Sequence, residues 1–277
     1  MSLGGYVKMT QHDKSLLEQT IVNSVQLTRY AVKEGEPDKS DVVMSTEGEV
    51  AFVDKGVTIW KVDIASQQTI APAQSETPHV KVDARWYTSQ EALEAGIEVL
   101  HGGSANSFGS MGTLLVPDNF KIPTVTASRT NVKYYGLSLV ETGEQFSISS
   151  ARYQVAMMRY VYGRNYKKDF LMQTQGGGGI FVETHDFPHV HIPLSEECGG
   201  YIVIGKPVKD AFHFTAFRIP FGYALVTPSG TIHGDGTLVG EYALTVADSA
   251  LAGADTALIY NEKTLSMAKG VVPDWPD

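Results

Sequence analysis

The sequence predicts an all-β protein, and three observations support that class. Residues 49–53 and 57–62 alternate in polarity around a turn at 54–56, and residues 132–140 and 145–148 flank a second turn at 141–144. Each pair has the pattern of a β-hairpin. Turn residues also separate shorter strand-like runs, which cover 154–162, 179–184, 201–204, 212–219, 224–226, 238–246 and 256–260. Short strand-like runs separated by turn residues are typical of a β-sandwich or barrel.

The third observation is that helical patterns are scarce. The best one runs from Ser89 to Leu100, where Thr88 and Glu91 have the spacing of a capping box and Gly102 follows the end. A weaker helical pattern covers Asp13 to about Ile21. We therefore expect a β protein with little helix.

Composition excludes several classes of protein. The net charge is −9 over 277 residues, and no basic run suits a phosphate backbone, so nucleic acid is a poor partner. No apolar run approaches the roughly 20 residues of a membrane helix, and no signal peptide precedes the first strands. The single cysteine, Cys198, has no internal partner and is expected to be structural. These features predict a cytoplasmic protein without membrane contact.

Histidines gather in one short stretch. The chain has 8 His, and three of them, His185, His189 and His191, fall within seven residues. Side chains at positions i and i+2 of a strand point to the same face, so His189 and His191 can reach one point inside a barrel. Glu196 follows five positions after His191, which allows its carboxylate to return to that point.

A fourth histidine follows a tight turn farther along the chain. Gly222 and the strand after it lead to Pro228-Ser229-Gly230, and His233 comes three residues later. A Pro-x-Gly turn reverses the chain and can direct His233 back over a barrel interior.

Together the two segments resemble the two motifs of the cupin superfamily. The first motif is matched at His189, His191 and Glu196, and the second from Gly222 through Pro228 and Gly230 to His233. Three positions depart from the pattern: Glu183 and Val203 stand where the first motif has glycines, and Thr237 stands where the second has Asn. These positions shape turns in the family, so the departures affect loop details more than the ligands.

The resemblance implies a double-stranded β-helix, the cupin jelly-roll barrel, in the C-terminal half. It also implies one divalent transition metal (Fe, Mn, Zn, Ni, Co or Cu) held by His189, His191, Glu196 and His233, because nitrogen and oxygen ligands suit all of these ions. The implied function is a metal-dependent enzyme of isomerase, dioxygenase or lyase type, acting on a small polar organic molecule through metal-bound oxygens. The alternative is a non-catalytic binding protein.

The domain organisation that follows has a metal-binding barrel at 128–265 and a flexible tail at 266–277. Residues 1–127 are β-rich, either as a degenerate second barrel or as extra strands and a helix around the first. Edge strands of such barrels often pair, so a homodimer is expected.

Other residues near the motifs have weaker assignments. Glu183 or Glu197, or Glu196 if it leaves the metal, could serve as a base. His185 is either a pocket-rim residue or a solvent-exposed loop residue, and His213 is expected to make local contacts. His79 and His101 receive no role. The remaining candidates are anion anchors or pocket walls, namely Lys206, Arg218, Tyr201, Phe214 and Tyr223.

Overall fold

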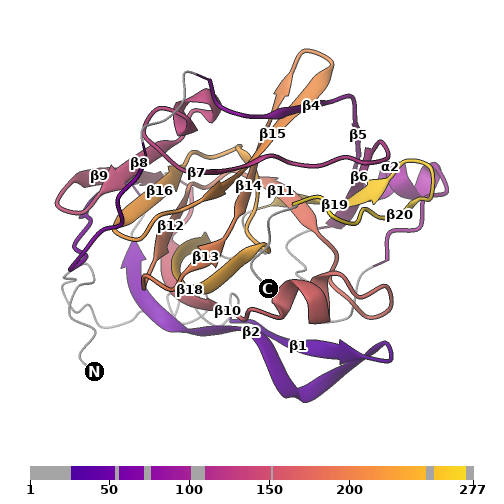
Figure 1. Cartoon of the computed structure of the whole chain (residues 1–277), viewed down its shortest axis with the longest axis horizontal. Helices are drawn as coiled ribbons and strands as arrows, with labels where there is room; N and C mark the ends of the chain where they lie inside the picture. Colours follow the sequence, from indigo (N-terminus) through magenta and orange to yellow (C-terminus); the bar gives the residue numbers. More distant parts are fainter. Residues whose placement is uncertain are drawn as a thin grey trace.

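The computed structural model describes residues 26–53, 56–71, 76–100, 110–150, 152–247 and 253–272. Within these residues strands predominate, which confirms the all-β class (Figure 1). Strands β10, β12 and β18 lie in a curled sheet that forms about half of a barrel.

An eight-stranded sheet forms one side of the described structure. Its members in spatial order are β1 (Thr28–Lys33), β2 (Glu36–Val53), β10 (Val155–Tyr162), β18 (Leu238–Ala247), β12 (His189–Pro193), β16 (Tyr223–Thr227) and β8 (Ser138–Glu141), with β13 (Gly199–Gly200) on β18. The pairings between these neighbours are antiparallel.

A ten-stranded sheet forms the other side. Its members in spatial order are β4 (Val80–Val82), β15 (Ala211–Arg218), β14 (Ile202–Val208), β17 (Ile232–Gly234), β11 (Phe181–His185), β19 (Ala254–Asn261), β6 (Ser110–Val116) and β5 (Arg85–Tyr87), with β20 (Ser266–Met267) on β19 and β7 (Thr124–Thr126) on β15. A separate pair joins β3 (Gly56–Lys61) to β9 (Gln145–Ser150).

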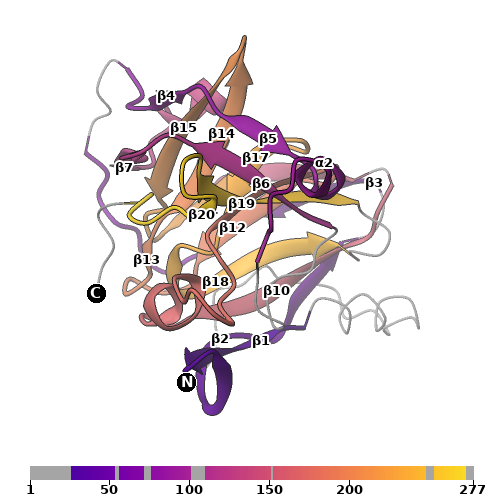
Figure 2. The same cartoon turned by 90° about the vertical axis from the view of Figure 1, so that its right-hand side faces the viewer.

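Strands from the first half of the chain extend the sheets of the second half. β2 pairs with β10, β4 with β15, and β6 with β19, so the N-terminal strands lie at the flanks of both large sheets (Figure 2). Both halves of the chain therefore contribute strands to the same two sheets.

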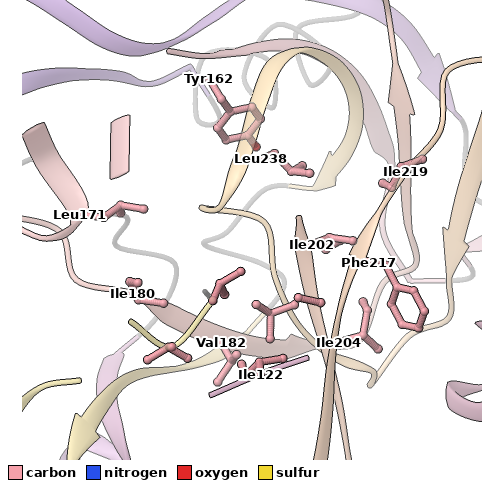
Figure 3. Close-up of a cluster of buried hydrophobic side chains, with 14 of the residues drawn as sticks. Ile122, Tyr162, Leu171, Ile180, Val182, Ile202, Ile204, Phe217, Ile219 and Leu238 are labelled. Atoms are coloured by element: carbon pink, nitrogen blue, oxygen red, sulfur yellow. The ribbon is translucent and has the colours of Figure 1, made fainter. Parts of the chain in front are cut away.

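The main core draws side chains from both large sheets (Figure 3). Tyr162 of β10 and Leu238 of β18 belong to it, as do Ile204 of β14 and Phe217 of β15, and all four are buried. Burying such side chains stabilises the fold by about 1.5–3 kcal/mol each.

A second apolar cluster explains why β12 is buried on both faces. Val190 and Ile192 pack with Trp60 of β3 and Phe146 of β9, on the side away from the histidines. Since side chains alternate along a strand, His189 and His191 face the space between the large sheets.

Most of the predicted strand runs are confirmed to within a few residues, but residues 132–135 of the run at 132–140 form a 3₁₀ helix. Both predicted hairpins are wrong. β2 is followed by β3, yet β3 pairs with β9, and β8 pairs with β16 instead of β9. The turn before β9 does form, with Glu144 N–H donating to the Glu141 carbonyl. The chain therefore passes into a different sheet between β2 and β3, and again between β8 and β9.

Helices are short in the described residues. The predicted helix at Ser89 is confirmed as α2 (Ser89–Glu94), with the expected capping box between Thr88 and Glu91, but it ends six residues early. Gly96 has a φ of 72° and ends the helical turn there. A 3₁₀ helix, η1 (Val132–Tyr135), and a π-helical turn, η2 (Lys167–Leu171), complete the set. The pattern at 13–21 lies outside the described residues.

Part of the expected flexible tail is packed against the core. Residues 266–267 form β20, and Val271 and Val272 are fully buried, with the Val271 carbonyl accepting a hydrogen bond from Ile122 N–H. Residues 273–277 lie outside the described residues. Among the helices of the described residues, none has the length and apolar character to cross a membrane.

Gly222, the glycine that opens the second motif, is predicted to be required for stability. Its φ is 90°, and an added Cβ would lie 2.2 Å from Gln67 Cβ. Gly143 has almost the same φ, 89°, with open space around it. The strain of positive φ costs about 1–3 kcal/mol at either position. Gly222→Ala should therefore lower the free energy of unfolding in urea clearly more than Gly143→Ala. Equal losses would contradict the packing argument.

Candidate metal centre

A small cavity between the two large sheets contains the candidate site. Its volume is about 30 Å³, which is enough for an ion with one or two waters. Residues of both sheets line it, and apart from Asp235 and Ala254 all of them are buried. They are Met44, Tyr160, Tyr162, Tyr166, Phe181, Glu183, His185, Phe187, His189, Asp235, Leu244, Val246, Ala247 and Ala254.

Strand pairing brings Glu183 and His233 together. β11 lies between β17 and β19, and Glu183 is the direct cross-strand partner of His233 on one side and of Thr256 on the other. Directly opposed residues point to the same face of a sheet. Glu183 Oε1 lies 3.5 Å from His233 Nε2, and Glu183 Oε2 accepts a hydrogen bond from Thr256 Oγ1 at 3.4 Å.

The Pro-x-Gly turn of the second motif determines where β17 begins. Gly230 has a φ of 76°, and its N–H donates to the His185 carbonyl at 2.7 Å. This bond attaches the turn to the end of β11. His233 Nδ1 is 2.9 Å from the carbonyl of Thr231, so the ring is oriented by its own strand and its Nε2 points to Glu183.

His185 ends β11, and His189 begins β12 after the break at Pro188. His185 Nδ1 lies 2.9 Å from the Phe187 carbonyl, and the two rings stack with centroids 3.7 Å apart. The ring centroids of His185 and His189 are 4.5 Å apart, and those of His189 and His233 are 4.7 Å apart. The short loop therefore folds both histidines toward His233.

Four side chains thus form one buried cluster: Glu183, His185, His189 and His233. One ligand atom from each lies within 4.8 Å of the others, which is the arrangement of a possible metal site. The Nε2 atoms of His185 and His233 are buried without a hydrogen-bond partner. When Nδ1 donates to a backbone carbonyl, the Nε2 lone pair is free, which is how metal-binding histidines are commonly held.

Burial lowers the pKa values of three of the histidines at this site. It lowers the pKa of His185 to about 3 and the pKa of His189 well below its usual value, and neighbouring imidazoles add to both shifts. Burial also lowers the pKa of His191, although Asp235 opposes it. His233 is the exception: burial lowers its pKa, but Glu183, the Thr231 carbonyl and Asp235 together outweigh burial and raise it. Neutral imidazoles are the form that binds metals.

The structure brings together two of the four predicted ligands. His189 and His233 belong to the cluster. His191 is fully buried beside it, and its ring centroid is 5.2 Å from that of His189. Glu196 is exposed, and its carboxylate accepts a hydrogen bond from Ser66 Oγ at 2.9 Å. Glu183 supplies the carboxylate of the cluster, at the position where the first cupin motif has a glycine.

His185 is the residue whose role the sequence left open. It is buried in the cluster, so the solvent-exposed alternative is wrong. The available signal was Glu183-x-His185, a second pair at i and i+2 that shares the parity of His189 and His191.

Several other candidates lie away from the cavity. Cys198 is buried, with Sγ 3.0 Å from the Glu241 carbonyl, which confirms a structural role. His213 contacts Tyr134 and stacks on His79, so its local role is also confirmed. The predicted wall residues Tyr201, Phe214 and Tyr223 do not line the cavity, and its aromatic walls come from other residues, including Tyr160, Tyr162 and Tyr166. The predicted anion anchors Lys206 and Arg218 do not line it either, and neither does Glu197, which is exposed. His101 lies outside the described residues.

Comparison of the chain with protein-family models, with curated proteins and with solved structures finds no match. The class that the described fold and site define is therefore a β protein with a buried cluster of histidines and a carboxylate that could hold a metal.

The metal-free protein is predicted to lose stability as the pH falls below about 6.5. His185, His189 and His191 have lowered pKa values, so the unfolded chain binds protons first and acid favours unfolding. Each such group contributes a slope of up to about 1.4 kcal/mol per pH unit. His233 has a raised pKa, so its own contribution is fully present below about pH 6.5 and is lost only as the pH rises above that value. Urea unfolding of chelator-treated protein measures the effect, and His185→Gln should reduce the slope. A stability that does not change between pH 7 and pH 5 would contradict this electrostatic description.

Proposed function

We propose that Glu183, His185, His189 and His233 bind one divalent transition metal and that the protein is a metal-dependent enzyme of the cupin type. The observation that carries the proposal is the convergence of four buried ligand atoms, with imidazole nitrogens that have no hydrogen-bond partner in the described residues. Burying a polar atom without a partner costs about 1–3 kcal/mol, and a metal bond would remove that cost.

The donor set fits a metal of the first transition series. Three imidazoles and one carboxylate suit Fe, Mn, Zn, Ni, Co or Cu, and they disfavour Ca²⁺ and Mg²⁺, which prefer all-oxygen sites. The backbone carbonyls of Phe187 and Thr231 orient two of the imidazoles, as they do at established metal sites. The four ligand atoms lie within 4.8 Å of one another, so shifts of about 1 Å in their positions would bring all of them to bonding distance of one ion.

The proposed enzyme would act on a small molecule that binds through oxygen. A bound divalent metal would act as a Lewis acid toward substrate oxygens, at the positions that four protein ligands leave open. The protein contributes a cavity with apolar walls at Met44, Leu244 and Val246 and polar groups at Tyr162 and Asp235. Burial of these groups strengthens their electrostatic interactions with a bound ligand. Isomerase, dioxygenase and lyase chemistry are all compatible with it.

One observation favours the alternative of a non-catalytic metal- or ligand-binding protein. The cavity volume of about 30 Å³ is far below the roughly 300 Å³ at which pockets for organic ligands begin. A substrate larger than a few atoms would need the walls to move. Turnover of a small oxygen-bearing compound or consumption of dioxygen by the metal-loaded protein supports the enzyme; tight metal binding without either supports the alternative.

The carboxylate ligand is predicted to be Glu183 and not Glu196. Glu183→Gln should lower metal affinity by about 10-fold or more, because it weakens the one anionic ligand of the cluster. Glu196→Gln is the matched control and should leave affinity unchanged, since Glu196 is exposed and bonded to Ser66. Equilibrium dialysis with Zn²⁺ or Mn²⁺ measures both variants. Loss of binding in Glu196→Gln with retention in Glu183→Gln would restore the ligand set expected from the motif.

A further inference from the structure

Four basic side chains gather on one face of the ten-stranded sheet. His213 of β15 is the direct cross-strand partner of Lys81 of β4 on one side and of Lys206 of β14 on the other. Directly opposed residues point to the same face of a sheet, so these three side chains form a row. The ring of His79, two residues before Lys81, stacks on the His213 ring with centroids 4.5 Å apart. None of the four side chains lines the cavity of the metal centre.

This basic row has no acidic partner. The ion pairs of the described residues involve other side chains. Asp83 and Glu262 line the same open pocket as Lys81 but form no ion pair with it. Burial lowers the pKa of His213, and the three neighbouring basic groups lower it further, because like charges repel. In a chain with 31 Asp and Glu against 22 Lys and Arg, such a group stands out, and a bound anion would relieve its repulsion.

Tyr134 of η1 holds two members of the row in place. Lys206 Nζ donates to the Tyr134 carbonyl and lies 3.5 Å from the centre of the Tyr134 ring. An ammonium group has three N–H donors, so two of them remain for a ligand. His213 Nδ1 is hydrogen-bonded to Tyr134 Oη, which leaves its Nε2. The row therefore keeps unused donors in fixed positions.

The segment that carries His79 is fixed as well. His79 Nδ1 donates to the Thr77 carbonyl at 2.9 Å, and Thr215 Oγ1 donates to the Pro78 carbonyl at 2.6 Å. His79 is exposed, and no hydrogen bond within the described residues uses its Nε2. Side chains that are already positioned lose less conformational entropy when they bind a ligand.

An anion fits this group better than a metal ion does. Two histidines with unused Nε2 atoms can bind a metal, but a lysine flanks His213 on each side, and an ammonium group repels a cation. The same lysines attract an anion, and an imidazole that gains a proton at Nε2 donates to it. A phosphate group carries about two negative charges and has several acceptor oxygens, so it can bind to several such donors at once.

We propose that His79, Lys81, Lys206 and His213 form a binding site for a phosphate group, separate from the metal centre. The phosphate belongs either to the free inorganic ion or to a small phosphate ester, because both present the same oxygens. Tyr134 is a positioning residue, since it holds Lys206 and His213 without being needed as a donor. The site lies outside the metal cavity, so it does not depend on the proposed function.

The test is a titration with inorganic phosphate at about pH 7 and constant ionic strength, followed through the NMR signals of the histidine rings. The signals of His79 and His213 should shift and saturate. Lys81→Gln and Lys206→Gln should each weaken binding about 5-fold, because each removes a charged donor. Lys33→Gln is the matched control: it removes the same charge from a lysine that pairs with Asp38 in the other large sheet, and it should leave the affinity unchanged.

A second titration with glycerol phosphate distinguishes the two sources of the phosphate group. Saturation by either compound supports the site, and the tighter of the two identifies the source. The proposal is overturned if neither compound gives a saturable shift, or if both lysine variants bind as tightly as wild type. It is also overturned if Lys33→Gln weakens binding as much as they do, since only the net charge would then matter. If Lys206→Gln fails to fold, Lys81→Gln, at an exposed position, decides alone.

Discussion

The fold buries a group of polar side chains that make few hydrogen bonds within the protein. Glu183, His185, His189, His191 and His233 are buried between the two large sheets, and most of their nitrogens have no hydrogen-bond partner in the described residues. Each such atom destabilises the folded state unless something binds it. The cluster lies within an extensive apolar core, and we interpret it as a binding site that the rest of the fold keeps in place.

Strand geometry explains why these five residues meet. β11 and β12 contribute side chains at alternate positions, with Glu183 and His185 on one strand and His189 and His191 on the next. The hydrogen bond from Gly230 to the His185 carbonyl attaches the second motif to the first. On its other face β12 packs against the small β3–β9 sheet through Val190 and Ile192, which fixes the direction of the histidines.

Local sequence patterns predicted much of this and failed at particular points. Period-two alternation located most strands, and Thr88 with Glu91 located the start of α2, because both signals depend on neighbours in the chain. The hairpins were wrong because pairing partners are chosen by packing between distant strands, as in β3 with β9. The i, i+2 spacing predicted that His189 would face inward. Whether Glu183 or Glu196 supplies the carboxylate depends on the pairing of β11 with β17 and on the bond from Ser66, which no local pattern encodes.

The central claim is that one metal ion is bound by Glu183, His185, His189 and His233. A crystal structure of the metal-loaded protein, with anomalous diffraction recorded at the absorption edge of the metal, tests it most directly. We predict an anomalous peak about 2.0–2.2 Å from one ligand atom of each of these four residues. A peak coordinated by Glu196 in place of Glu183, or no peak between the two sheets at saturating metal, would contradict the account.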